Sequence, residues 1–245
     1  MAFEGFKSIS LSTASTNIVQ QIRASILDGA LPPGTQLNEK QLADQFAISR
    51  GPVREAMQRL IQEGLLRSEP HRGTFVVQLD AGDVADIYLG RRAVEHTAVM
   101  RLLRWEGTDV DKTIEELEAS LDEMNAAVES GDDRGAVAAD MRFHTILVDA
   151  ARSQRLSRMY HTLVAEAVLS MASLADKYPD WRATVVREHR EILDALRQRD
   201  ENETLRILDE HFVLDDCLSY RGVMSHYLDP TRSSLGAAEA SVRSE

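Results

Sequence analysis

Apolar residues recur every three or four positions along most of this chain, a spacing that places them on one face of a helix. The first stripe consists of Ile18, Ile22 and Ile26, and the glycines and prolines of segment 28–34 end it. A shorter helix is expected over 38–46, which begins with an asparagine followed three residues later by a glutamine, as in a capping box. Two helices separated by a break are therefore predicted at the start of the chain.

A third helix and two strands are predicted immediately afterwards. Ser49 is a suitable N-cap residue, and Pro52 falls in the first helical turn, where its missing N–H costs nothing. After Gly64 the period changes, and segments 65–68 and 74–77 have the composition of two short strands joined by a hairpin. Three helices followed by a hairpin form a winged helix-turn-helix, whose third helix enters the major groove of DNA. The buried face of that helix is predicted to consist of Val53, Met57, Leu60 and Ile61.

The chain from residue 81 to about residue 228 has helical periodicity and no strand signal. We predict an antiparallel all-α bundle there, which makes the fold class mostly α. The domains are expected to cover 1–79 and 80–229, followed by a disordered tail over 230–245 that is rich in serine and alanine. The six helices of the bundle are predicted at 82–106, 109–130, 132–151, 154–176, 181–199 and 201–226.

Charge is distributed unevenly between these two parts. The net charge of −12 would argue against a nucleic-acid partner if it were evenly spread. Residues 1–79 instead carry 8 basic and 7 acidic side chains, whereas residues 80–245 carry 20 basic and 33 acidic ones. This asymmetry predicts two units with different partners.

Cysteine usage and hydropathy limit the cellular setting. The single cysteine, Cys217, excludes an intramolecular disulfide and a thiolate metal cluster. The first ten residues lack the apolar stretch of a signal peptide, and no uninterrupted apolar run reaches the roughly 18 residues of a membrane span. We therefore expect a cytoplasmic protein with no membrane partner.

The third predicted helix carries the chemistry expected for DNA binding. Arg50 and Arg54 are four residues apart on one face of its first turn, where they can reach guanine edges or phosphates. Ser49 and the backbone N–H groups at the helix start suit a phosphate, and Gly51 leaves the approach to the groove clear. Taken one by one, these arginines could equally be solvated surface charges.

The first part of the chain closely resembles the DNA-binding domain of GntR-family transcription regulators. The motifs that carry the resemblance are Ile22-Arg-x-x-Ile26, Gly29-x-Leu31-x-Pro33-Gly34-x-x-Leu37, Gln41-Leu-Ala43, Ser49-Arg-x-Pro-Val-Arg-Glu-Ala56, Leu60-x-x-Glu63-Gly64-Leu65 and Arg72-Gly73. Where Arg72 stands, the family usually has a second glycine. By position, the resemblance implies major-groove and backbone contacts from Lys40, Ser49, Arg50, Gly51 and Arg54, and a minor-groove approach by His71, Arg72 and Gly73.

Histidines on predicted core faces are the unusual feature of the second part. Asp140 and His144 are four residues apart, and both therefore project from one helical face. His189 and His211 stand among apolar positions of two further helices. One carboxylate and three imidazoles from three helices could occupy most of an octahedral metal site. Hydrogen-bonded core histidines are the alternative interpretation, because such spacings also occur without a metal.

The second part resembles the FCD effector domain of the FadR-like branch of the GntR family. The matching motifs are Tyr88-x-x-Arg91-x-x-x-Glu95, Asp140-x-x-Phe143-His144, Glu188-His189-x-x-Ile192-x-x-Ala195 and His211. The prediction of six helices, and not seven, resembles the VanR-type subgroup of this branch. The resemblance implies that Asp140, His144, His189 and His211 bind a divalent metal ion, zinc or nickel, which helps to hold a small carboxylate effector. It also implies that Arg91 neutralises the carboxylate of this effector, a task that suits a bidentate guanidinium.

These features predict a transcription regulator, and not an enzyme, that binds operator DNA as a homodimer and acts as a repressor controlled by its effector. One alternative is a metal-dependent enzyme that acts on a small organic acid, since an open metal position permits such chemistry. Another is a regulator that a metal stabilises without any effector.

Overall fold

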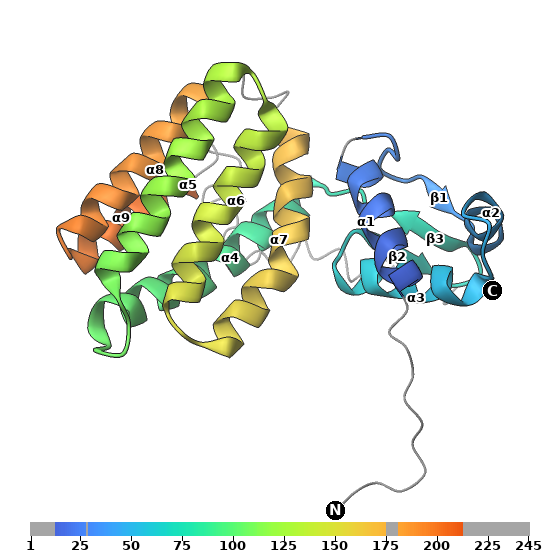
Figure 1. Ribbon diagram of the computed structural model, residues 1–245, viewed down its shortest axis with the longest axis horizontal. Helices are drawn as coiled ribbons and strands as arrows, with labels where there is room; N and C mark the ends of the chain where they lie inside the picture. Colours follow the sequence, from blue (N-terminus) through green and yellow to red (C-terminus); the bar gives the residue numbers. More distant parts are fainter. Residues whose placement is uncertain (1–12, 28, 175–180, 213–245) are drawn as a thin grey trace, which may run out of the picture. The chain divides into compact units, whose positions relative to one another are not determined.

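The computed structural model describes residues 13–27, 29–174 and 181–212, and the chain is divided into two compact units between Gln78 and Leu79 (Figure 1). The predicted tail over 230–245, the end of the last predicted helix and Cys217 lie outside the described residues. Each unit is described separately below.

The first unit is a three-helix domain with a small antiparallel sheet. Helix α1 packs on α3, α2 packs on α3, and the strands lie in the order β1-β3-β2. Ile22, Val53, Leu60 and Leu65 are among its fully buried side chains. This is the predicted winged helix-turn-helix. Its elements are α1 (Thr13–Leu27), β1 (Gln36–Leu37), α2 (Glu39–Gln45), α3 (Arg50–Gln62), β2 (Leu66–Glu69) and β3 (Gly73–Val76).

Local sequence signals set the ends of the two helices that form the helix-turn-helix. The side chain of Asn38 accepts hydrogen bonds from the backbone N–H groups of Lys40 and Gln41, as an N-cap residue should. Ala47 lies in the turn between α2 and α3 with a positive φ of 54°. Ser49 occupies the N-cap of α3, but its side chain makes no capping hydrogen bond. Its hydroxyl therefore does not serve α3.

The second unit is a bundle of helices without strands among its described residues. Aspartates cap four of them, at positions 80, 109, 132 and 200, and each side chain accepts a backbone N–H of the first turn. The mostly α fold is thereby confirmed. The described helices of this unit are α4 (Ala81–Arg104), α5 (Val110–Ser130), α6 (Asp133–Ala150), α7 (Gln154–Leu174), α8 (Trp181–Arg197) and α9 (Glu201–His211).

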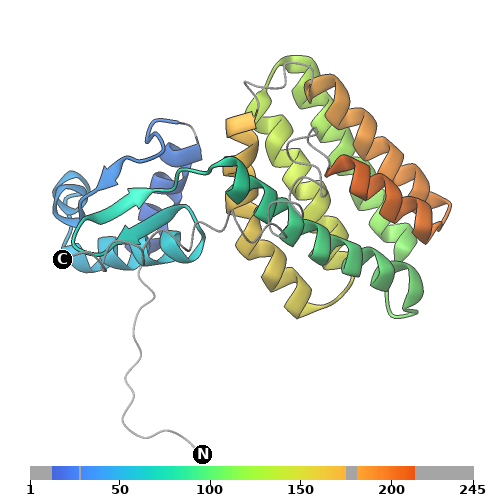
Figure 2. The same ribbon diagram turned by 180° about the vertical axis from the view of Figure 1, so that it is seen from behind.

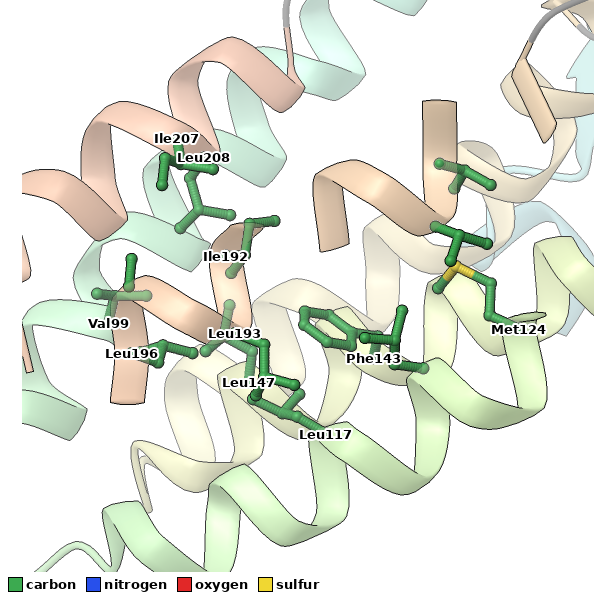
Figure 3. Close-up of a cluster of buried hydrophobic side chains, with 14 of the residues drawn as sticks. Val99, Leu117, Met124, Phe143, Leu147, Ile192, Leu193, Leu196, Ile207 and Leu208 are labelled. Atoms are coloured by element: carbon green, nitrogen blue, oxygen red, sulfur yellow. The ribbon is translucent and has the colours of Figure 1, made fainter. Parts of the chain in front are cut away.

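One apolar core joins α4, α5, α6, α8 and α9 (Figure 3). Helix α9 also packs beside α4, as the reverse view shows (Figure 2). Polar side chains that α4, α6, α8 and α9 direct inward therefore meet in one buried region. The labelled members of the core are Val99, Leu117, Met124, Phe143, Leu147, Ile192, Leu193, Leu196, Ile207 and Leu208.

Differences from the predicted elements are small. Strand β1 was not predicted, and helix α1 begins at Thr13, five residues before Ile18, the first residue of its predicted apolar stripe. Ile61 is half-buried, whereas the other three residues of the predicted α3 face are buried. None of the described helices combines the length and apolar character that crossing a membrane requires.

Candidate functional site

The first candidate site is the exposed surface formed by the helix-turn-helix and the wing. All eight residues predicted to contact DNA are exposed on the first unit. Gly51 has open space where a Cβ would stand and no positive φ, so the fold itself does not require glycine there. The eight residues are Lys40 on α2, Ser49, Arg50, Gly51 and Arg54 at the start of α3, and His71, Arg72 and Gly73 at the wing.

The wing is held in a defined shape. His71 has a positive φ of 61° and Gly73 one of 112°. The side chain of Gln36 on β1 donates a hydrogen bond of 2.7 Å to the carbonyl oxygen of Arg72. Arg72 also pairs with Glu69 across the turn. The predicted wing contacts are thus carried by a turn that is tied to the sheet.

One ion pair connects α2 and α3 on this surface. The Nε of Arg54 donates to both carboxylate oxygens of Glu39, at 3.1 and 3.2 Å, and its Nη2 donates to Oε2 at 3.0 Å. Glu39 was not singled out in the sequence, because a glutamate in the first turn of a helix is ordinarily explained by the helix dipole.

The second candidate site is a buried cluster of Asp140, His144, His189 and His211. One ligand atom from each residue lies within 4.8 Å of all the others. The Nε2 of His144 is 3.1 Å from the Nε2 of both His189 and His211, and His189 Nε2 is also 3.1 Å from Asp140 Oδ1. The structure therefore brings together the four residues that the sequence predicted as ligands.

Each imidazole is oriented by a partner at its other nitrogen. The Nδ1–H of His189 donates to the carbonyl oxygen of Val185 at 2.7 Å, because a carbonyl can only accept. In the same way, His144 donates to Glu95 at 2.6 Å, and His211 donates to Glu188 at 2.9 Å. Three Nε2 lone pairs consequently converge on one point, as in sites where outer residues orient metal-binding histidines.

The electrostatics of the cluster favour the ligand forms of Asp140, His144 and His211. Burial lowers the pKa of His144 well below its ordinary value, and burial also lowers the pKa of His211. Although burial alone would raise the pKa of Asp140, the neighbouring His189 lowers it below its ordinary value. Neutral imidazoles beside an ionised carboxylate are what a divalent cation requires.

This donor set passes a simple test of fit to a metal ion. The buried Oδ2 of Asp140 has no hydrogen-bond partner among the described residues. Ligand atoms about 2.0–2.1 Å from zinc lie roughly 3.0–3.4 Å apart at neighbouring positions, close to the observed 3.1 Å. Without a cation, the converging lone pairs would repel one another unless one imidazole took up a second proton.

Arg91 lies next to the cluster. Its side chain is buried and lies over the rings of Tyr88 and Phe212, at 5.3 and 5.1 Å from their centroids. Its Nε donates to Oε1 of Glu95 at 3.1 Å, and the other oxygen of Glu95 accepts from His144. Glu95 therefore links Arg91 to a predicted metal ligand.

Several contributors to this site were given no role from the sequence, although Glu95 and Glu188 belong to the matching motifs. Glu95 stands four residues after Arg91 on the same helix face, a spacing that could have indicated their pairing. Glu188 precedes His189, but it orients His211 on another helix, which no local spacing reveals. The buried hydroxyl of Tyr160 lies near Arg91 and interacts with its guanidinium.

Taken together, these features define a winged-helix, DNA-binding transcription regulator with a helical second domain. Residues 14–76 match the model of bacterial regulatory proteins of the gntR family, and residues 86–214 match the FCD domain. The chain belongs to the GntR family, in the group that carries an FCD domain. The predicted family is thus confirmed.

Relatives of known name support this assignment over nearly the whole chain. A "Probable D-xylose utilization operon transcriptional repressor" of Paenarthrobacter nicotinovorans is 30% identical and covers 97% of both chains. A "Gluconate operon transcriptional repressor" of Bacillus licheniformis is 30% identical over 82% of this chain and 84% of its own. A crystal structure of a GntR regulator from Rhodococcus sp. RHA1 has a TM-score of 0.70 at 27% identity, with 82% of this chain and 94% of that chain covered. These relatives are regulators, and the interpretation as an enzyme is therefore set aside.

Proposed function

We propose that this protein is a cytoplasmic repressor whose affinity for operator DNA is controlled by a small carboxylate bound beside a metal ion. The DNA-binding part rests on the exposed basic residues at the start of α3. Repression is supported by the relatives in Paenarthrobacter and Bacillus, which are named as repressors.

In the proposed complex the first turn of α3 enters the major groove. Arg50 and Arg54 would contact guanine edges or phosphates, and the uncommitted hydroxyl of Ser49 would join the helix N-terminus in binding a phosphate. Lys40 would add a backbone contact from α2. His71, Arg72 and Gly73 would approach the minor groove from the wing.

A homodimer follows from the small DNA contact surface of one winged helix-turn-helix domain. A single helix-turn-helix contacts few base pairs, which gives too little specificity for a genomic site. Two copies would read half-sites about 34–36 Å apart on a pseudo-palindrome.

The buried cluster would hold a divalent metal, zinc or nickel, through Asp140, His144, His189 and His211. The observation that supports this is that three imidazole nitrogens and one carboxylate oxygen lie within 4.8 Å of one another. When bound, such a metal supplies a positively charged centre with positions open to an anionic oxygen. Hydrogen bonds to Glu95, Glu188 and the Val185 carbonyl oxygen would hold the imidazole rings in the orientation in which each Nε2 faces the metal.

An unsatisfied donor supports a carboxylate as the effector. The buried Nη2 of Arg91 has no hydrogen-bond partner in the described part of the chain. A buried donor without an acceptor costs free energy, which an anionic oxygen bound to this group would recover.

Effector binding would act on DNA affinity through the positions of the helices. Arg91 on α4 is joined by Glu95 to His144 on α6, so an anion at Arg91 and the cation site share one hydrogen-bond network. An effector that binds two arrangements of the bundle unequally shifts their populations. A changed separation of the two DNA-binding domains of the dimer would then weaken operator binding.

The test is DNA binding by the full-length protein, measured by fluorescence anisotropy on its own promoter fragment and on random DNA. We expect preference for the promoter fragment, weakened by gluconate or by another acid of a panel that includes citrate and acetate. Arg91→Lys keeps the positive charge but removes Nη2, and it should abolish the acid response while metal content is unchanged. Equal affinity for both DNAs under all conditions would refute the proposal.

A regulator with a metal but no effector predicts a different outcome. In that case metal removal would lower thermal stability, while no acid of the panel would change DNA affinity. Arg91→Lys would then be indistinguishable from wild type in the DNA assay.

A further inference from the structure

The ion pair between Arg54 and Glu39 uses only one edge of the guanidinium. The Nε and Nη2 groups donate to Glu39, and among the described residues nothing accepts from Nη1. Arginine has five N–H donors in a rigid fork. Fixing the Nε edge therefore leaves the opposite end of the fork oriented and available for a second bidentate partner.

Stability alone explains this pair poorly. The side chains of Arg54 and Glu39 are 65% and 35% exposed, and exposed ion pairs contribute little to folding. The carboxylate also stands among residues proposed to meet DNA, where a negative charge repels phosphates. A carboxylate there is most useful if it controls what Arg54 does in the complex.

An unrestrained arginine on this surface would be free to turn toward the nearest phosphate. Contacts to phosphates raise affinity for any sequence, whereas contacts to base edges select a sequence. Glu39 offers Arg54 two acceptors at 3.0–3.2 Å and so competes with the phosphates for the Nε edge. The free end of the fork matches the O6 and N7 acceptors of guanine.

We propose that Glu39 is a positioning residue that holds the guanidinium of Arg54 for reading a guanine, so that Glu39 determines base specificity at one position of each half-site. This inference rests on the proposed function, in which Arg54 meets the major groove. Glu39 touches no base in this arrangement and acts through Arg54.

A second ion pair in the same unit provides a matched control. Arg23 on α1 donates through Nε and Nη2 to Glu63 at the C-terminal end of α3, at 3.2 and 2.6 Å. This pair has the same chemistry, but it lies at the end of α3 opposite to Arg54. Glu63→Gln therefore removes a comparable ion pair without altering the predicted DNA surface.

The experiment is selection of bound sequences from a randomised double-stranded DNA library by the full-length protein, followed by sequencing. Wild type, Arg54→Ala, Glu39→Gln and Glu63→Gln are compared, and affinity for poly(dA-dT), which contains no guanine, is measured for each. We expect Arg54→Ala to lose its preference at one guanine position. Glu39→Gln should lower the preference at the same position about 5- to 10-fold, with poly(dA-dT) affinity unchanged or increased. Glu63→Gln should retain the wild-type motif.

The possible failures are distinguishable. If Arg54→Ala changes no position of the motif, both the base-reading role of Arg54 and this inference are wrong. If Arg54→Ala loses the guanine but Glu39→Gln keeps it, only the role of Glu39 is wrong. The double variant Glu39→Gln with Arg54→Ala should match Arg54→Ala alone at that position, and an additional loss would also overturn the inference.

Discussion

Replacement of a single histidine should separate a metal centre from an ordinary buried histidine cluster. His189 is fully buried and its Nε2 lies 3.1 Å from both His144 Nε2 and Asp140 Oδ1. If a cation belongs at this point, zinc will stabilise the wild-type protein but not His189→Ala. If the cluster is held together by a proton, neither protein will respond to zinc.

The expected size follows from linkage and from the length of the second unit. A ligand at 100 times its dissociation constant stabilises the folded state by about 2.7 kcal/mol. For a unit of this length, each kcal/mol shifts the Tm by about 2–4 °C. Zinc should therefore raise the Tm of the wild-type helical unit by about 5–11 °C.

The assay is thermal unfolding followed by circular dichroism, after removal of metal with EDTA and again after addition of zinc. His189→Ala also leaves a cavity against Phe143, whose ring centroid is 4.7 Å from that of His189, so the quantity compared is the zinc-induced shift within each protein. Asp140→Asn provides a second variant with the volume conserved, and His161→Ala, on the exposed side of α7, is the control. A zinc shift retained by His189→Ala and Asp140→Asn, or no shift and no bound zinc in wild type, would refute the assignment of these ligands.

Three further predictions concern other parts of the chain. Arg54→Ala should weaken binding to the promoter fragment about 5- to 150-fold in anisotropy titrations without changing metal content. Leu60→Ala should lower the free energy of unfolding by about 2–5 kcal/mol in urea, because this core side chain is fully buried; a loss below about 1 kcal/mol would contradict its role in the core. Burial and the carboxylates of Asp83 and Asp86 raise the pKa of Glu166, so the ionised form opposes folding as the pH rises. Glu166→Gln should therefore have a higher Tm than wild type at about pH 7.5 and the same Tm at about pH 4. A Tm equal to that of wild type at both pH values would show that the ionised carboxylate does not destabilise the folded state.

Much of the fold could be predicted because its signals are local. The caps at Asn38 and at the aspartates of the bundle place helix starts within a few residues, and the apolar stripes identify the buried faces. Strand β1 escaped because two residues, one of them the exposed Gln36, cannot show a period of two. It forms only because β3 provides a partner, which is information from the three-dimensional structure.

The candidate site was predictable only in part, for the same reason. Asp140 and His144 share a helix face, so their proximity follows from spacing, whereas their meeting with His189 and His211 depended on resemblance to a family. Glu95 and Glu188 orient histidines that lie on other helices, and the spacing of residues along the sequence does not indicate such contacts. The sequence likewise does not indicate the ion pair of Glu39 with Arg54, which connects two helices across the turn of the helix-turn-helix.

The burial of the histidine cluster also bears on how fast its contents can change. The side chains of His144 and His189 are fully buried and that of Asp140 is 2% exposed, while His211 retains 10% exposure. His211 occupies the last turn of α9 and is the most exposed of the four. An ion at this depth would leave only when the helices around it locally open, and such openings are rare events in a packed bundle. The residence time of the metal would then greatly exceed the time in which a small acid comes and goes, so the cation would act as a lasting part of the receptor and the acid as its rapidly exchanging signal.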